Sequence, residues 1–179
     1  LPLVPGGSGM QNLADLSRYQ LDNLIRSWKE IAAEFDIILI DTGAGLSKNV
    51  IKFVLAADEV ILISTPEPTS ITDAYGVIKV VRNYDQDIKV KLMVNQAQND
   101  KHGTRIGRKL INTTRDFLGL EIELLGVLPK DQAVEKSVIR RRPFFLEFPR
   151  SRVVKAVNNI AAKLTDKELE SSKGVKGFF

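Results

Sequence analysis

The sequence predicts an α/β fold in which a doubly wound, mainly parallel sheet carries helices on both faces. Three observations lead to this prediction: short apolar runs recur along the chain, segments with helical periodicity separate them, and several runs end in polar residues. The strand-like runs are residues 1–4, 37–40, 60–64, 90–95 and 124–128. Such an alternation is what parallel strands joined by crossover helices require.

The predicted helices fill the gaps between these runs in chain order. Apolar residues in 13–31 largely follow three- and four-residue spacing, which predicts an amphipathic helical segment. A second helix is expected over 71–84, with Thr69 and Ser70 as its caps, and further helices over 104–118 and 151–164. These elements place one domain over residues 1–165 and leave a polar tail over 166–179. The tail ends in two phenylalanines near two lysines, so it is either the start of a membrane-surface amphipathic segment or a frayed terminus.

Asp41 is the most informative candidate for a functional residue. The apolar run 37–40 does not alternate with polar residues, as expected of a strand buried on both faces, and it ends directly in Asp41. Ligands of parallel sheets bind at the carboxyl ends of strands, so Asp41 is placed where a Mg²⁺-nucleotide would bind. Gly43 and Gly45 would allow the backbone to approach a phosphate closely. The alternative is a strand-end aspartate in an ordinary turn.

Composition excludes several classes of function. The chain has 179 residues, 44% hydrophobic and 27% charged, which suits a single globular domain. No apolar run is long enough to cross a bilayer and the start has no signal-peptide pattern, so we expect a cytoplasmic protein. The absence of cysteine excludes disulfides, Cys₄ zinc sites and iron–sulfur clusters. The single histidine, His102, lies in a turn-like stretch and is expected to be a solvated loop residue.

The net charge of +4 is concentrated near the carboxyl end. Five arginines fall in a short stretch that also contains phenylalanines and prolines, which predicts a loop with apolar anchors: Arg140, Arg141, Arg142, Arg150 and Arg152. Such a cluster could contact nucleic acid, acidic lipid or an acidic protein, or it could be a solvated basic helix end.

A phosphate-binding loop of the form GxxxxGK[ST] is missing from the sequence. The glycines at 6, 7 and 9 imitate its spacing, but Met10 and Gln11 stand where a lysine and a hydroxyl would be required, so we interpret these residues as a turn. The chain also begins with Leu1 and Pro2, and we expect it to be the back portion of a longer protein.

Four motifs in order resemble the MinD/ParA family of deviant P-loop ATPases. They are the stretches D41-T-G-A-G45, T65-P-E-P-T-S-I-T-D-A74, V94-N-Q-A97 and G126-V-L-P-K-D131. Within the family, the chain is most similar to the flagellar number regulators called FlhG, FleN or YlxH, and the resemblance covers residues 1 to about 163. The amino-terminal part of the family, with its lysine-bearing phosphate loop, has no counterpart here.

The resemblance implies a set of residue roles. Asp41 matches the switch II acid, which organises Mg²⁺ and the attacking water, and Gly45 matches the glycine whose N–H contacts the γ-phosphate. Asn95 matches the asparagine that reads adenine. Pro129 and Asp131 match the loop that borders adenine. Asp73 matches an acid at the dimer interface. The alternatives are a capping amide for Asn95, a turn proline at 129 and a first-turn helix acid at 73.

The resemblance also implies a function. The family uses ATP, ADP and Mg²⁺ in a switch in which ATP holds two protomers together and hydrolysis releases them. The expected partners are a second copy of the chain, an FlhF-like SRP-type GTPase, flagellar basal-body or transcriptional proteins, and reversibly a membrane surface. Without the phosphate loop, we expect this chain alone to bind ATP poorly and not to hydrolyse it. Two alternatives stay open: a ParA-like partition protein that binds DNA nonspecifically through the arginine cluster, and a pseudo-ATPase interaction module.

Overall fold

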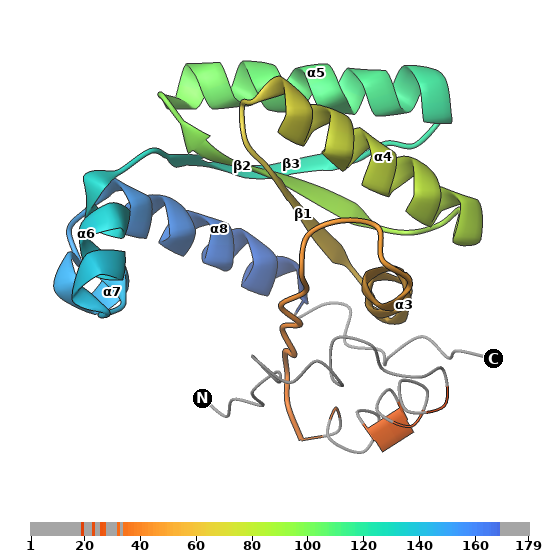
Figure 1. The fold of residues 1–179 in the computed structure, drawn as a ribbon, viewed down its shortest axis with the longest axis horizontal. Coiled ribbons are helices and arrows are strands. Elements are labelled where there is room, and N and C mark those ends of the chain that lie inside the picture. Colours follow the sequence, from red (N-terminus) through yellow and green to blue (C-terminus); the bar gives the residue numbers. More distant parts are fainter. Residues whose placement is uncertain (1–18, 20–22, 24–25, 28–31, 33, 169–179) are drawn as a thin grey trace. The chain divides into compact units, whose positions relative to one another are not determined.

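A computed structural model describes residues 19, 23, 26–27, 32 and 34–168 of the chain (Figure 1). The chain divides into two compact units, residues 1–58 with 174–179 and residues 59–173. Each unit is described by itself. In the first unit, helix α3 (Lys48–Ala56) begins after Ser47, whose side-chain oxygen accepts a hydrogen bond from the N–H of Val50 at 3.3 Å. Ser47 is thus an N-cap, which provides a hydrogen-bond acceptor for an N–H that has no partner within the helix.

The second unit is built on three parallel strands in the order β1-β2-β3 (Figure 1). They are β1 (Val60–Ser64), β2 (Val90–Ala97) and β3 (Glu123–Pro129). Ser64 pairs with Val94, which in turn pairs with Val127. The carboxyl ends of all three strands therefore meet at one edge of the sheet.

Helices cover both faces of this sheet. On one face lie α4 (Pro68–Tyr84) and α5 (Asp100–Leu118), which connect β1 to β2 and β2 to β3. After β3 come α6 (Gln132–Arg140), α7 (Phe144–Glu147) and α8 (Arg152–Glu168), and α8 packs on the opposite face (Figure 1). The predicted α/β class with a parallel sheet and helices on both faces is confirmed. None of the described helices is both long and apolar enough to cross a membrane.

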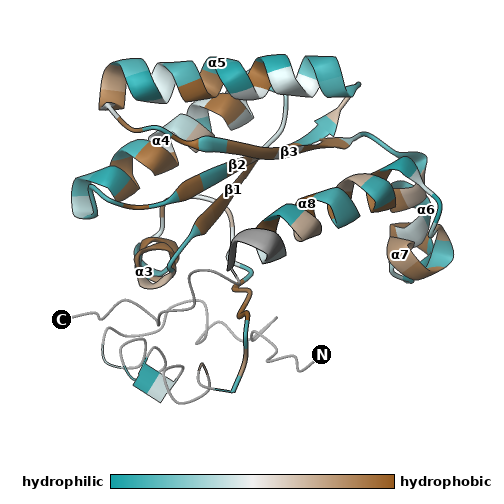
Figure 2. Ribbon diagram, turned by 180° about the vertical axis from the view of Figure 1, so that it is seen from behind, coloured by the Kyte–Doolittle hydropathy of each residue, from teal (hydrophilic) through white to brown (hydrophobic). Residues whose placement is uncertain are grey.

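The central strand β2 forms the middle of the core, and all three strands contain hydrophobic residues, drawn in brown in Figure 2. Leu92 and Val94 are completely buried. Helix α5 lies close to the sheet because Gly103 faces it: a Cβ at this position would be 2.3 Å from Val127 Cγ1 and 2.9 Å from Ala97 Cβ. Only a residue without a side chain allows this approach.

Most predicted elements of the second unit are confirmed with shifted ends. The predicted strands 60–64, 90–95 and 124–128 correspond to β1, β2 and β3, and the three later helices correspond to α4, α5 and α8. The cap prediction for α4 is wrong: the helix begins at Pro68, and Glu67 is the N-cap without a side-chain bond. Helices α3, α6 and α7 were not predicted, and the stretch that contains α7 was expected to be a loop.

Two further predictions are wrong. Residues 37–40 form no strand, and Leu39 is 81% exposed, because no strand among the described residues pairs with this segment. His102 is not a loop residue: it lies in the first turn of α5 and is half-buried. The helix starts here because Asn99 is its N-cap and accepts the N–H of His102 on its Oδ1 at 2.8 Å. The predicted strand at 1–4, the glycine turn at 6–9, most of the helix at 13–31 and residues 169–179 lie outside the described part.

Candidate functional site at the carboxyl edge of the sheet

The end of β2 carries an irregularity that matters for the site. Between the pairs Val94–Val127 and Ala97–Pro129, β2 has two residues where β3 has one, so the strand is bulged at Asn95 and Gln96. Gln96 has a φ of 57°, a left-handed conformation that is uncommon for residues other than glycine. Bulges re-aim side chains and occur often beside active sites, and strained backbone is concentrated at functional positions. This geometry singles out the residue pair at the end of β2 as a candidate binding position.

Asn95 is half-buried, and its side chain folds back over the bulge. Its Oδ1 accepts a hydrogen bond from the N–H of Gln96 at 2.8 Å. The amide nitrogen remains as the group that can donate to an acceptor on a base edge. The oxygen thus satisfies the backbone of the bulge and does not cap a helix, since the N-cap of α5 is Asn99, and the contact of the nitrogen with adenine stays a prediction.

The loop after β3 is tied to the end of β2. The N–H of Lys130 donates to the carbonyl oxygen of Ala97 at 2.8 Å, and Pro129 is buried as the last residue of β3, paired with Ala97. Asn95 and the loop at Pro129 therefore lie at the same edge, as the resemblance implied. The predicted adenine-contacting role of both residues stays a prediction.

Asp131 lies in this loop, and its carboxylate is engaged by the protein itself. Oδ1 accepts the N–H of Ala133 at 2.9 Å, which caps α6, and Oδ2 accepts the N–H of Val153 at 3.2 Å, in the first turn of α8. Negative charge at a helix start is stabilising, and one carboxylate serves two helices here. Sequence reasoning missed this second bond, because Asp131 and Val153 are 22 positions apart in the chain.

The end of β1 holds a hydroxyl network that sequence reasoning also missed. Ser70 Oγ accepts the N–H of Thr65 at 2.9 Å and lies 3.2 Å from Ser64 Oγ. The hydroxyl of Thr65 is buried and has no hydrogen-bond partner among the described residues. Ser70 thus joins α4 to the strand end and does not cap the helix.

Asp41 and Gly45 belong to the first unit, which is described by itself. Asp41 is exposed and lies in a stretch without helix or strand. Gly45 has a φ of +99°, a conformation that favours glycine, and a Cβ there would meet nothing within 4 Å. Both features leave the backbone and the carboxylate open to a ligand, and their predicted catalytic roles stay predictions.

Asp73 is exposed on α4, one turn after the helix start. An exposed carboxylate in this position is compatible with the predicted contact to a second protomer. The alternative of a first-turn helix acid is wrong, because the helix begins at Pro68 and its first turn contains no acidic residue. The structure contains one chain, so the assignment stays a prediction.

The arginine cluster lies at the end of α6, in the turns before and after α7, and at the start of α8, and part of its charge is neutralised internally. Arg140 pairs with Glu147, Arg142 lies 3.9 Å from the same carboxylate, and the Arg140 guanidinium lies over the Phe148 ring at 5.7 Å. Ile139 and Leu146, 81% and 80% exposed, add an apolar component. We call residues 132–148 the α6–α7 arm; its mixed apolar and basic surface differs from the continuous positive charge that favours nonspecific DNA binding.

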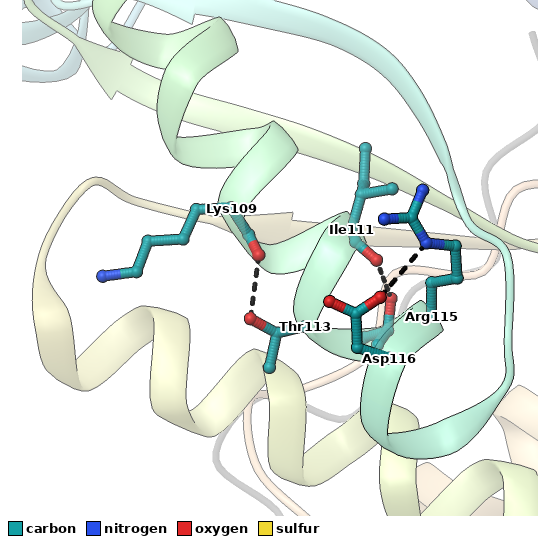
Figure 3. A network of polar contacts seen from close by, with 6 residues as sticks. Lys109, Ile111, Thr113, Arg115 and Asp116 are labelled. Atoms are coloured by element: carbon teal, nitrogen blue, oxygen red, sulfur yellow. Dashed lines mark hydrogen bonds and ion pairs between the residues drawn. The ribbon is translucent and has the colours of Figure 1, made fainter.

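A hollow on α5 does not qualify as an active site. Its lining comes from the outer side of this one helix, including Lys101, Arg105 and Arg108. Several polar groups along the same helix are satisfied locally: the Thr113 hydroxyl donates to the carbonyl of Lys109, the Thr114 hydroxyl donates to that of Ile111, and Arg115 pairs with Asp116 (Figure 3). No second element converges on it, as an enclosed site would require. Among the described residues there is also no group of three metal-ligating acids, histidines or cysteines.

The chain is similar to known proteins along most of its length. The chain is 36% identical over 162 residues to the antiactivator FleN of Pseudomonas aeruginosa, which covers 90% of this chain and 58% of FleN. It is 29% identical over 185 residues to the flagellum site-determining protein YlxH of Helicobacter pylori, covering 100% of this chain and 62% of YlxH. No model of a protein family matches.

A solved structure shows the same fold. The septum site-determining protein MinD of Pyrococcus horikoshii, complexed with Mg-ADP, matches with a TM-score of 0.67 at 20% identity, over 93% of this chain and 65% of that one. The chain thus spans less than two thirds of the length of each of these proteins.

Proposed function

Because the chain belongs to the MinD/ParA family of ATPases, we propose that it is part of an ATP-dependent dimerising switch that regulates flagellar number and placement. The likeness to FleN and YlxH supports the flagellar role. The observation that carries the nucleotide role is the bulged end of β2, which lies beside the loop after β3 through the Lys130–Ala97 hydrogen bond.

The residues present fit an adenine nucleotide at this edge. Asn95 would donate its amide nitrogen to the base, and the loop from Pro129 to Asp131 would border it. In the first unit, the open N–H region at Gly45 would contact the γ-phosphate, and the exposed Asp41 carboxylate would hold Mg²⁺ through water and orient the attacking water. When bound, Mg²⁺ supplies neutralisation of the phosphate charge.

The chain lacks the lysine-bearing phosphate loop, so we propose that by itself it binds ATP weakly and does not hydrolyse it. Isothermal titration with MgATP should show no tight binding to these 179 residues. The product of the complete reading frame that encodes the chain should bind and hydrolyse ATP. Tight Mg²⁺-dependent binding to the present chain would contradict the first statement.

Asn95→Ala tests the base-reading role in the product of the complete reading frame. Losing one hydrogen bond to the base should lower ATP affinity by about tenfold and reduce the preference for ATP over GTP. The melting temperature should fall slightly, because the bond from the N–H of Gln96 to Oδ1 is lost as well. Asn112→Ala is the matched control, because Asn112 is exposed on the outer side of α5. Equal affinities of the two variants would remove Asn95 from the site.

Partners and location are also part of the proposal. Asp73 is proposed to contact a second protomer when ATP is bound. The switch is proposed to be cytoplasmic and to engage an FlhF-like GTPase and flagellar basal-body or transcriptional proteins. It is also proposed to associate reversibly with a membrane through residues 166–179. Asp73→Lys should prevent ATP-dependent dimerisation in analytical ultracentrifugation, because charge reversal at an interface is repulsive.

The second candidate, nonspecific DNA binding by a ParA-like protein, has weaker support. Its cations are partly paired with Glu147 and interspersed with exposed apolar side chains. Phosphate contacts would make DNA retention fall steeply with salt. A chain that is not retained on DNA at low salt would exclude this candidate.

A further inference from the structure

Asp131 occupies the point where the candidate nucleotide edge meets two helices. Its backbone follows Lys130, whose N–H is bonded to Ala97 at the end of β2. Its two carboxylate oxygens accept N–H groups from α6 and α8. A continuous series of bonds therefore runs from the bulge at Asn95, through the loop, to the starts of both helices.

We propose that Asp131 is a positioning residue: its carboxylate fixes the β3–α6 loop against α8, so that the loop beside Asn95 and the α6–α7 arm are held together with α8. The carboxylate itself does not need to contact the nucleotide. This proposal deepens the proposed function and rests on it only where nucleotide affinity is concerned.

The two hydrogen bonds of the Asp131 carboxylate, to Ala133 and to Val153, form the connection that we call the joint, and its charges and contacts make it strong. Hydrogen bonds from backbone N–H groups to an ionised carboxylate are stronger than bonds between neutral groups, and each helix start adds a favourable dipole term. Asp131 is half-buried, which weakens competition from water. A second bond of α8 is also defined: Lys163 donates to the carbonyl of Leu125 on β3 at 3.1 Å, so α8 is bonded to the sheet as well as to the loop.

The α6–α7 arm is the part that this joint would control. The arm begins at Gln132, immediately after Asp131, and presents exposed Ile139 and Leu146 together with Arg141. A shift of the loop would have to carry the start of α6 and the start of α8 together or break one of the two bonds, because both oxygens belong to one rigid carboxylate. The geometry thus provides a direct path from the nucleotide edge to an exposed surface.

Asp131→Ser separates the two bonds. Serine is about as good an N-cap as aspartate, so α6 keeps its cap, but the single, shorter hydroxyl cannot also accept the N–H of Val153. Asp131→Ala removes both bonds. The matched control is Ser151→Ala, which removes the 3.4 Å bond from the N–H of Val154 to Ser151 Oγ at the same helix start without touching the loop.

Residue-resolved amide hydrogen exchange on the full chain measures the joint without any nucleotide. In Asp131→Ser, exchange at Val153 and at Lys130 should rise by about tenfold, while Ala133 stays protected. In Asp131→Ala all three amides should exchange faster. In Ser151→Ala, only amides of α8 should change. Asp131 would be merely a helix cap if the exchange rate of the Val153 amide were unchanged in Asp131→Ser. The same would follow if the exchange rate of the Lys130 amide rose equally in Ser151→Ala.

Nucleotide titration of the product of the complete reading frame completes the test. Asp131→Ser should weaken ATP binding by about tenfold, whereas Ser151→Ala should bind as the unmodified protein does. Unchanged affinity in Asp131→Ser would overturn the positioning role at the nucleotide edge. If the unmodified protein bound no nucleotide, the proposed function would fail, and the exchange measurement would still decide whether the joint exists.

Discussion

Two apolar runs in this chain look alike in sequence and differ completely in structure. Residues 37–40 end in Asp41, and Val90–Ala97 contains Asn95 near its end. The second run is the buried centre of a parallel sheet, in which Leu92 has no exposed surface. In the first run no residue is paired in a strand, residues 37–39 are exposed, and Ile40 is half-buried.

This difference shows that an apolar composition allows a segment to form a strand, but the strand forms only where other elements pair with it and pack against it. A strand is stable when its N–H and C=O groups find a ladder partner and its side chains find a packed face. β2 has β1 on one side, β3 on the other, and α5 against one face. No described strand offers the same to residues 37–40.

Hydrogen exchange should show the largest contrast between the two runs. Amides of residues 91–94 should exchange at least about a thousandfold more slowly than those of residues 37–41 in the same sample, because the former open only with the core. Mass spectrometry of peptides from each run provides the measurement. Comparable protection of both runs would mean that 37–41 is paired in solution.

Much of the second unit was predictable because its signals are local. Apolar runs of five or six residues, helical spacing over 71–84, 104–118 and 151–164, and order along the chain were sufficient for β1, β2, β3, α4, α5 and α8. α6 was missed because Asp131, which caps it, was considered only as a ligand contact.

The candidate site was less predictable, for a physical reason. Sequence motifs placed Asn95, Pro129 and Asp131 at strand ends, and the structure brings these three to one edge. Nothing in the sequence indicates that Gln96 adopts a positive φ, since glutamine does not favour it, or that the carboxylate of Asp131 reaches Val153 on another helix. These features arise from long-range packing.

Matched leucine substitutions should sharpen the comparison in free energy. Leu92→Ala should lower the free energy of unfolding by about 3 kcal/mol, because it leaves a cavity at a completely buried position. Leu39→Ala should change it by less than about 0.5 kcal/mol, because its side chain is already in solvent. Urea denaturation at constant slope provides both values. A large loss for Leu39→Ala would indicate a packed environment for the first run.

Matched glycine substitutions in two helices should give smaller effects of opposite sign. Gly103→Ala should lower the free energy of unfolding by about 1–2 kcal/mol despite the better helix propensity of alanine, because the new Cβ would meet Ala97 Cβ, a group without a rotamer to move. Gly76→Ala, on α4, should raise it by about 0.5–1 kcal/mol, because a Cβ there meets nothing within 4 Å. Urea denaturation again measures both. If Gly103→Ala proved stabilising, α5 would have to lie farther from β2, and the tight packing that distinguishes this run from residues 37–40 would not exist at its carboxyl end.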